Sequence, residues 1–499
     1  MNKEPDIKAK KRKLGPAQLA IAANLQDPLL SQVSNFLAQQ LKPNQHVLLG
    51  LSGGLDSCVL LHLLAAAQQI VPFHLHAMHV HHGLSVNADA WATFCTEQCV
   101  LLNIPLQIIK VDIEASPKLG IEAAARQLRY EALFNNVLPD LLVPNQADFI
   151  VTAHHQDDQA ETLLLQLFRG AGVKGLASMA AVDPSRRLLR PLLEVSRQTL
   201  QDYAEHHQLK WCDDESNADT HYERNFLRHN IMPILETRYP AIKSVLARSA
   251  SHLAEANELL DALAELDATT LLLNNSLCLN GLAQLAQVRA KNVLRWWFAK
   301  NQLAMPSSEH LSEIINQLLN AKADANINIQ LNISGQINLS NQTNLSSQIN
   351  LSSQINHSCQ TQHLTLKRFQ HRAYLLAEQS APVFDLLWTG EAELSLPNGA
   401  KLHFKQVMGA GLALKFGMTK LRITNRAGGE RFKPNVLRPT RTLKHLLQEA
   451  NIPPWQRDYL PLIYWHDTLA FVPYIGMANE LQATEHELGL EITWQDLSV

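Results

Sequence analysis

The sequence LLGLSGGLDS occupies residues 48–57 and runs directly into an apolar segment, residues 58–66, that is expected to be helical. A strand, a glycine turn and a helix start in this order place backbone N–H groups at the positive end of a helix dipole, which suits a phosphate chain. Glycine is needed there because a Cβ atom would keep the backbone from approaching the anion. No Gly-Lys-Ser/Thr follows, so this is not a Walker A loop. The alternative is a serine-rich helix cap after a tight turn.

Short apolar runs alternate with helical patterns from residue 46 to about residue 211. Strands are expected at residues 46–51, 73–80, 106–111 and 149–153. This alternation is typical of an α/β fold in which crossover helices cover a doubly wound parallel sheet. Such sheets bind ligands at the carboxyl ends of their strands, so the residues that follow each strand are the candidates for a site.

Two polar clusters follow predicted strands. Residues 78–85 read MHVHHGLS, and residues 152–162 read TAHHQDDQAET. In the second cluster, Asp157 and Glu161 are one helical turn apart, so both carboxylates could hold Mg²⁺ or accept a proton from one helix face. The alternative is a helix start that is enriched in acids for dipole reasons. The histidines of the first cluster match no common zinc-ligand spacing.

The composition indicates an ordinary globular protein without a membrane span. The chain has 499 residues, of which 46% are hydrophobic and 18% charged, and its formal net charge is -3. The basic N-terminal segment lacks the apolar run of a secretory signal and is expected to be a disordered tail. The six cysteines form no CxxC pair and are too sparse for a disulfide framework, which favours a reducing cytoplasm.

The SGGxDS pattern after the first strand resembles the pyrophosphate loop of the PP-loop ATP pyrophosphatases, which include GMP and asparagine synthetases, tRNA thiolases and lysidine synthetases. The loop alone does not choose among them. Together with the two polar clusters, further motifs are similar in order and spacing to the tRNA(Ile)-lysidine synthetases. They are GIEAAARQLRY at 120–130, RPLL at 190–193, WCDDESN at 211–217, RNFLR at 224–228, GGERF at 428–432 and LKHLLQEANIPPWQRDYLP at 443–461.

This resemblance implies an ATP-dependent ligation of free L-lysine to C2 of the wobble cytidine of tRNA(Ile) with a CAU anticodon. ATP would first adenylate the C2 oxygen with release of diphosphate, and the lysine amine would then displace AMP. The nucleotide-binding residues that the resemblance implies are Ser52, Gly53, Gly54, Leu55, Asp56, Ser57, His81 and Gly83.

The chemistry that the resemblance implies assigns roles to a few charged residues. Mg²⁺ held by Asp56 and Asp158 would neutralise charge on the leaving diphosphate, with Asp157 as the other candidate carboxylate. Arg126 is expected near the α phosphate, although a solvated helix face is an equal alternative for this residue alone. Free lysine arrives protonated because its amine has a pKa of about 10.4. Asp158 and His155 are both candidates to remove that proton.

A basic stretch lies late in the chain. Between Gly411 and Leu447, Lys and Arg occur nine times and the only acidic residue is Glu430. The stretch predicts a tRNA-binding surface, with an ordinary solvated surface as the alternative. The expected tRNA contacts are Arg431, Lys433 and Lys444 here and Arg224 and Arg228 nearer the middle of the chain.

The expected domain order follows from these patterns. We expect a basic tail at 1–20, a PP-loop catalytic domain at 21–218, a linker at 219–245, a helical tRNA-handling domain at 246–382 and a small α+β tRNA-binding domain at 383–499. Residues 336–359 form four polar hexads within a low-complexity insert at 330–360. A flexible insertion is favoured over a short β-solenoid, and no function is assigned to it. A monomer and a homodimer both remain open.

Other functional classes make different predictions. A tRNA thiolase would normally need catalytic or cluster-binding cysteines, and the lack of a CxxC pair is evidence against it. A metal-dependent phosphohydrolase built on residues 154–158 would act without ATP. A non-catalytic tRNA-binding protein is disfavoured because the loop keeps all its Ser, Gly and Asp residues.

Overall fold

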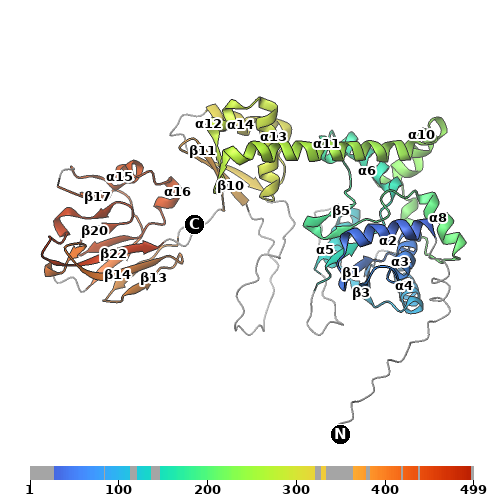
Figure 1. The fold of residues 1–499 in the computed structure, drawn as a ribbon, viewed down its shortest axis with the longest axis horizontal. Coiled ribbons are helices and arrows are strands. Elements are labelled where there is room, and N and C mark those ends of the chain that lie inside the picture. Colours follow the sequence, from blue (N-terminus) through green and yellow to red (C-terminus); the bar gives the residue numbers. More distant parts are fainter. Residues whose placement is uncertain are drawn as a thin grey trace, which may run out of the picture. The chain divides into compact units, whose positions relative to one another are not determined.

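The computed structural model describes residues 27–83, 85–112, 121–135, 146–320, 328–332, 363–377, 382–416, 420–436 and 439–495. The chain divides into two compact units, Met1–Ala262 and Leu263–Val499 (Figure 1). The predicted basic tail and the four hexads lie outside the described residues. The finer division into five parts stays a prediction.

A six-stranded sheet forms the centre of the first unit, in the order β3-β2-β1-β4-β6-β5. Its first four strands are parallel to their neighbours, and only β5 runs antiparallel to β6. The predicted strands are all present, with ends shifted by one or two residues. The strands are β1 (Gln45–Gly50), β2 (Phe73–His81), β3 (Leu106–Lys110), β4 (Phe149–Val151), β5 (Val182–Asp183) and β6 (Leu188–Leu189).

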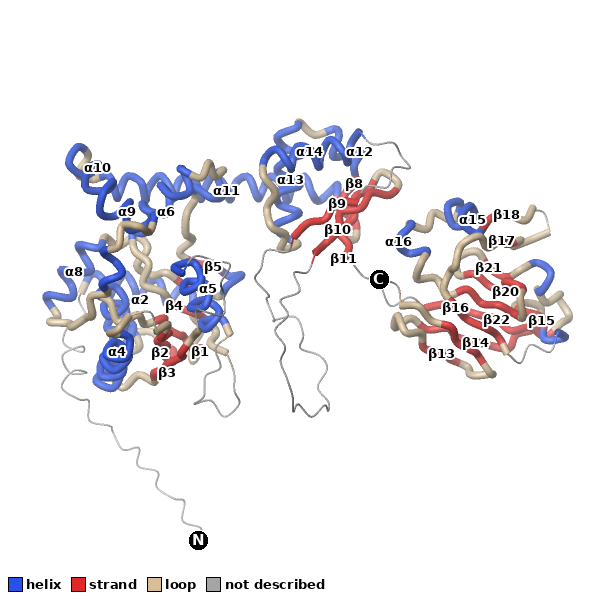
Figure 2. The backbone as a smooth tube through the Cα atoms, turned by 180° about the vertical axis from the view of Figure 1, so that it is seen from behind, coloured by secondary structure: helices blue, strands red, loops and turns tan. Residues whose placement is uncertain are grey.

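Both faces of this sheet are covered by helices (Figure 2). Along β1, Val47 and Leu49 pack into a core with α2, α3 and α8, whereas Leu48 packs into a second core with α5. A strand that is buried on both faces is expected to be apolar there, as Val47, Leu48 and Leu49 of β1 are. The helices are α2 (Pro28–Gln40), α3 (Leu55–Ala67), α4 (Ala88–Leu102), α5 (Ile121–Phe134), α6 (Gln156–Phe168) and α8 (Arg197–His206).

The strand order reverses at β1. The chain moves outward from β1 to β2 and β3, and then returns to the other side of β1 with β4. At such a reversal the loops after the two neighbouring strands turn away from each other and leave a crevice for a ligand. The loop at residues 51–54 and the cluster at residues 152–158 therefore flank this crevice.

The last part of the first unit is helical. It contains the short helices α7 (Val173–Leu176), α9 (Glu223–Phe226) and α10 (Met232–Arg238), and a π-helical turn, η3 (Leu227–Ile231), joins the last two. The 30-residue helix α11 (Ile242–Leu271) follows and crosses the boundary between the units. Much of the predicted linker, 219–245, is thus helical. In the described part of the chain, no helix has both the length and the apolar character needed to cross a membrane.

The second unit begins with helices packed on a sheet. Trp297 and Phe298 of α13 are fully buried in its core. The five-stranded sheet, in the order β7-β8-β11-β10-β9, adds to the expected helices. No strands were predicted in this region, and β7 and β8 are only two and three residues long. The elements are β7 (Leu272–Leu273), β8 (Ser276–Cys278), α12 (Leu279–Gln284), α13 (Gln287–Lys300), α14 (Ser308–Asn320), β9 (Asn328–Asn332), β10 (His363–Phe369) and β11 (Arg372–Ala377).

Antiparallel sheets with two short helices form the C-terminal part, in agreement with the α+β expectation. The strand orders are β12-β16-β19-β20-β21, β13-β14-β22-β15 and β17-β18. The strands are β12 (Asp385–Trp388), β13 (Glu393–Ser395), β14 (Lys401–Met408), β15 (Leu412–Ala413), β16 (Leu421–Thr424), β17 (Arg431–Phe432), β18 (Arg441–Thr442), β19 (Leu462–Trp465), β20 (Thr468–Val472), β21 (Gly476–Met477) and β22 (Leu488–Gln495), and the helices are α15 (Leu443–Glu449) and α16 (Pro454–Arg457).

Candidate functional site

The glycine loop after β1 has the conformation that its sequence predicts. Gly53 has a φ of 91°, and a Cβ atom there would lie 3.1 Å from the sulfur of Cys95. The Gly53 N–H donates to Ser57 Oγ at 3.1 Å, and the hydroxyls of Ser52 and Ser57 are 3.0 Å apart. Only glycine adopts this backbone conformation without strain. The hydrogen bonds of the two serine hydroxyls stabilise the turn.

The loop leads into the N-terminus of α3. Gly54 is the N-cap, and among the described residues no side chain caps this helix end. Gly54 N–H donates to Ser52 Oγ at 3.3 Å, and Cys212 N–H donates to Gly53 O at 2.9 Å. The second bond brings the predicted segment 211–217 to the loop. An uncapped helix start with a glycine turn is suited to bind the oxygens of a phosphate chain.

Two carboxylates from different loops meet at one histidine. His155, at the start of α6, is only 2% exposed, and its Nε2 lies 3.6 Å from Asp56 Oδ2 and 3.5 Å from Asp158 Oδ2. The His155 backbone N–H also donates to Asp158 Oδ2 at 3.1 Å. The site thus brings together three of the predicted catalytic residues.

Neighbouring charges shift the pKa values of His155 and Asp158. Burial lowers the pKa of His155, but the hydrogen bond to Asp56 and the charge of Asp158 raise it by more, so the pKa lies above its usual value. Burial would raise the pKa of Asp158, but His155 and Arg224 lower it to about 2. Burial lowers the pKa of the neighbouring His154 to about 3. The two carboxylates therefore favour the protonated form of His155.

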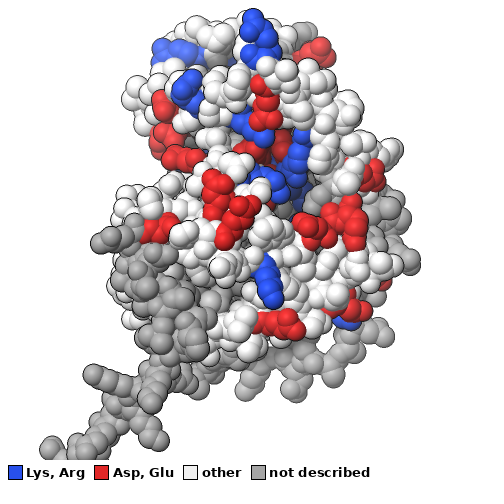
Figure 3. Space-filling model, turned by 90° about the vertical axis from the view of Figure 1, so that its right-hand side faces the viewer, with Lys and Arg blue, Asp and Glu red and all other residues white. Residues whose placement is uncertain are grey.

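Arg224 and Arg228, predicted as tRNA contacts, donate to acids of α6. Arg224 lies 3.0 Å from Asp158 Oδ1 and 2.8 Å from Glu161 Oε2, and Arg228 lies 2.7 Å from Glu161 Oε1. The Glu161 side chain is 3% exposed, and the two arginines are the cations that face its buried carboxylate. On the face shown in Figure 3, Lys and Arg side chains gather in a central hollow with Asp and Glu beside them. The spacing of RNFLR, two arginines one turn apart, is the sequence signal for this pairing.

Asp157 has other partners. Its Oδ1 accepts the Arg197 N–H at 3.1 Å, and its Oδ2 lies 2.9 Å from the Lys243 ammonium of α11. Asp157 and Glu161, which the sequence placed on one face, share no partner among the described residues. Asp158 and Glu161, three residues apart, share the two arginines instead.

The remaining first-unit candidates lie around the ends of β2 and on α5. His81 Nε2 is 3.1 Å from Asp89 Oδ1, and Gly83 has a φ of 66°. The Arg126 guanidinium lies over the ring of Tyr130, with 5.3 Å from its carbon to the ring centroid. This cation–π contact orients Arg126 without neutralising its charge.

Arg190, directly after β6, was quoted as part of a motif but given no role. It is 6% exposed, its Nη1 donates to Ala180 O at 2.6 Å, and its buried Nε has no hydrogen-bond partner among the described residues. Burial lowers its pKa, which the electrostatic interactions with Tyr130 and Asp183 partly offset. The two-residue strand before it was too short to be predicted.

The donors of this site fit a magnesium ion that also binds phosphate. Asp56 Oδ1 is buried and lacks a hydrogen-bond partner among the described residues. A buried oxygen of this kind is suited to bind a cation. Asp158 adds a second carboxylate, although its oxygens already accept hydrogen bonds. Within the described residues no three His, Cys, Asp or Glu side chains could hold a metal by themselves. Mg²⁺ commonly binds one or two carboxylates together with substrate phosphates.

The cysteines near the loop have unreactive thiols. Cys58, Cys95 and Cys99 are buried and form no disulfide. Burial raises the pKa of Cys58 and of Cys99 to about 12 and also raises that of Cys95. A nucleophilic cysteine requires the opposite shift.

The predicted tRNA contacts of the C-terminal part are exposed. Arg431 lies in β17, Lys433 follows this strand, and Lys444 lies in α15. The Arg431 guanidinium donates to the Thr440 carbonyl oxygen at 3.5 Å, and no ion pair with a described acidic residue compensates its charge. Their contact with tRNA stays a prediction.

Three family models match the chain. The PP-loop domain matches residues 25–235, the TilS substrate binding domain matches residues 277–340, and the TilS substrate C-terminal domain matches residues 421–494. The first match contains the glycine loop, α6 and both arginines of RNFLR.

Curated relatives match over almost the whole length. The tRNA(Ile)-lysidine synthase of Nitrosomonas europaea is 40% identical over 470 residues, which cover 92% of this chain and 93% of the relative. That of Serratia proteamaculans is 37% identical, over 93% of this chain and 99% of the relative. That of Azoarcus sp. is 36% identical, over 92% and 93%.

Proposed function

The chain belongs to the tRNA(Ile)-lysidine synthase family, and on this premise we propose that it uses ATP to join free L-lysine to C2 of the wobble cytidine in a tRNA(Ile) with a CAU anticodon. One observation carries the proposal. The PP-loop and the acidic start of α6 meet at the reversal point of the sheet, where Asp56 and Asp158 flank His155.

The reaction has two bond exchanges. In the first, the C2 oxygen of the cytidine attacks the α-phosphorus of ATP, an O–P bond forms, and the bond to diphosphate breaks. In the second, the lysine ε-nitrogen attacks C2, the C–O bond breaks, and AMP leaves with the oxygen. The products are lysidine in the tRNA, AMP and diphosphate.

The glycine loop binds the phosphates that leave. Its backbone N–H groups and the uncapped start of α3 face the β and γ phosphates, and Ser52 and Ser57 keep the loop in place. Asp56 and Asp158 would hold Mg²⁺, which supplies positive charge to the phosphate oxygens when it is bound. Arg126 provides a cation for the α phosphate, supported by its position over Tyr130.

The lysine amine must lose a proton before it attacks. The low pKa of Asp158 makes its carboxylate a weak base, whereas the raised pKa of His155 makes its neutral imidazole the stronger base, which supports neutral His155 as the group that takes this proton at Nε2. The tRNA is held by the exposed cations Arg431, Lys433 and Lys444, which would contact phosphates.

The test is incorporation of labelled lysine into unmodified tRNA(Ile) with a CAU anticodon, with AMP measured in the same sample. We expect one AMP per lysine attached, no attachment without ATP, and none to the same tRNA with uridine at the wobble position. Lysine attachment without ATP, or AMP release that is not coupled to attachment, would contradict the proposal.

A further inference from the structure

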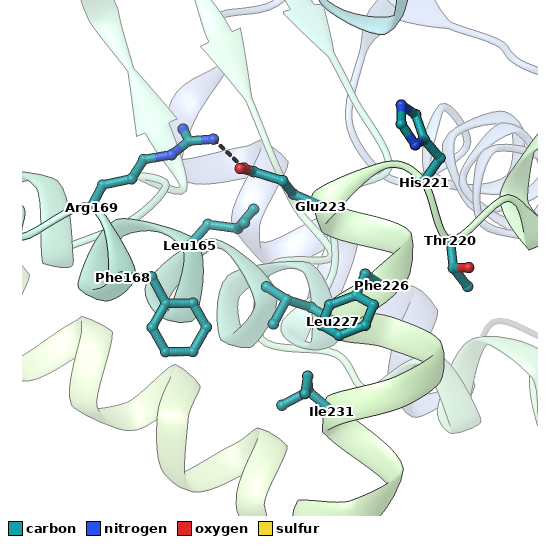
Figure 4. Close-up of a pocket in the computed structure, with 9 residues that line it drawn as sticks. All are labelled: Leu165, Phe168, Arg169, Thr220, His221, Glu223, Phe226, Leu227 and Ile231. Carbon is teal, nitrogen blue, oxygen red and sulfur yellow. Dashed lines mark hydrogen bonds and ion pairs between the residues drawn. The ribbon is translucent and has the colours of Figure 1, made fainter.

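A second pocket lies in the first unit, between the end of α6, α9 and the π-helical turn η3 (Figure 4). Its volume is about 410 Å³. Leu165 and Phe168 line it from α6, Phe226 from α9, and Leu227 and Ile231 from η3. None of these residues takes part in the nucleotide site described above.

Aromatic rings of this pocket are open to solvent. Phe168 is 66% exposed and Phe226 is 45% exposed. Solvent-exposed aromatic side chains that line a concave site are typical of surfaces that bind a flat apolar group. A nucleobase has two such faces and stacks on phenyl rings in a manner that tolerates its identity.

The rim of the pocket is polar, which a purely apolar partner helix would not match. Arg169 and Glu223 form an ion pair at 2.6 Å on the side opposite Ile231 (Figure 4), and their side chains are 61% and 71% exposed. An exposed pair of this kind contributes little to stability, so Arg169 can turn to a phosphate at small cost. Thr220 and His221 add groups that can hydrogen-bond to a base edge.

Two helices, α6 and α9, carry residues of both the pocket and the nucleotide site. Phe168 follows Asp158 by ten residues on α6, about 15 Å along the helix axis. Phe226 comes two residues after Arg224, which contacts Asp158. An RNA loop that delivers its target base to Asp158 therefore has neighbouring nucleotides within reach of the pocket. The π-helical turn η3, which lines the pocket, is a feature that is frequent at functional sites.

We propose that this pocket binds one unstacked nucleobase of the tRNA loop that carries the target cytidine. The base stacks on Phe168 and Phe226, and Arg169 exchanges Glu223 for the adjoining phosphate. This inference rests on the proposed function, since it takes the target nucleotide to lie at Asp158. RNA-binding proteins commonly recognise single-stranded loops by such stacking.

The experiment compares Phe168→Ala and Phe226→Ala with Phe168→Tyr and Phe226→Tyr. Loss of one base–aromatic stack is expected to raise the KM for tRNA about tenfold, with the KM for ATP unchanged. The tyrosine variants keep a stacking ring and should stay within about twofold of the parent enzyme. Leu259→Ala, at a 73% exposed position of α11, is the control for loss of an exposed apolar side chain.

The outcomes separate the pocket from the reaction. If the parent enzyme attaches no lysine, the proposed function fails. If it is active and both alanine variants keep the parent KM for tRNA, the pocket does not bind the RNA, whatever else it binds. A tyrosine variant as impaired as its alanine counterpart would also overturn the inference.

Binding of tRNA with 2-aminopurine at single loop positions gives a second measurement. Stacking of the 2-aminopurine on Phe168 should change its fluorescence in the parent and not in Phe168→Ala. An unchanged signal at every position would contradict the proposal.

Discussion

The carboxylates of Asp56 and Asp158 approach the same nitrogen of His155, at 3.6 and 3.5 Å. The two acids are about a hundred residues apart in the sequence and follow neighbouring strands, β1 and β4. Their meeting is a direct result of the reversal in strand order, which places the loops of these two strands at one crevice. The first predictions concern this pair.

Asp56→Asn should reduce AMP formation by about a hundredfold or more, because the variant loses a negative charge at the point where phosphate and metal charge must be balanced. The buried Oδ1 of Asp56 has no protein partner among the described residues, so the amide should fit without great loss of stability. AMP release is measured with saturating tRNA and lysine, and the melting temperature is the control. Normal turnover in Asp56→Asn would remove this residue from the mechanism.

Asp157 and Asp158 are adjacent in the sequence but should behave differently. Asp157 contacts Lys243 and the Arg197 N–H, so Asp157→Asn should lower the melting temperature and leave kcat within a few fold. Asp158→Asn should lower kcat strongly, because Asp158 contacts His155 and both arginines. Melting and lysine attachment are measured for both variants. A large loss of kcat in Asp157→Asn without loss of stability would show that Asp157 acts in catalysis.

Glu161 should be a major contributor to the stability of the first unit. Its carboxylate is buried, and Glu161→Gln leaves Arg224 and Arg228 with less compensating charge, which should cost about 3 kcal/mol. The matched control is Glu223→Gln, which removes an exposed ion pair with Arg169 in the same unit and should produce no measurable change. Urea unfolding of both variants, followed for the first unit, tests this. Equal stabilities would show that the buried network is not needed for folding.

Local patterns made the sheet and the phosphate loop predictable. The buried centre of β1, Val47–Leu49, is a continuous apolar run, and Gly53 has a positive φ that other residues rarely adopt. The partners of the acidic side chains on α6 were harder to predict. Helical spacing places Asp157 with Glu161 and Asp158 with Glu161 equally well. Lys243 lies 86 residues after Asp157, so its contribution arises only in the folded chain.

The pocket at the end of α6 was not predictable for the same reason. Phe226 lies in the RNFLR motif and Phe168 lies outside the quoted motifs, and each would ordinarily be assigned to a core. Their exposure becomes evident only when η3 and α9 are packed beside α6. Arg190 was recognised within a motif, but its burial depends on a short strand that carries almost no local signal.

His62 should make the first unit less stable in acid. Its Nδ1 lies 2.9 Å from the Tyr203 hydroxyl, and burial, with the charge of His207, lowers its pKa from 6.5 to about 4. The unfolded chain therefore binds a proton between pH 6.5 and pH 4 that the folded chain does not. This contribution to stability is complete above the unfolded pKa and is lost as pH falls through this window, by about 3 kcal/mol.

His62→Gln provides the comparison, because glutamine keeps a polar contact for Tyr203 and does not titrate. The drop in melting temperature between pH 7 and pH 5 should be smaller in this variant than in the parent. His252→Gln, at an exposed position of α11, should retain the parental drop. Equal drops in the parent and His62→Gln would show that another group, such as the nearby Asp27, governs the acid sensitivity.

Arg431 and Lys433 should act on tRNA binding alone. Both side chains are exposed on the C-terminal part, far in sequence from the PP-loop. Arg431→Glu or Lys433→Glu should therefore raise the KM for tRNA several fold. The kcat, the KM for ATP and the melting temperature should stay unchanged. A phosphate contact also sets the salt dependence, since each one releases counterions from the RNA. The slope of log KM for tRNA against log salt should therefore fall by about one for each cation removed. Lys405→Glu, which changes an exposed cation of β14, controls for net charge and should leave both the KM and the slope unchanged. If all three variants raise the KM equally, tRNA responds to the overall charge of the protein and not to a surface formed by Arg431 and Lys433.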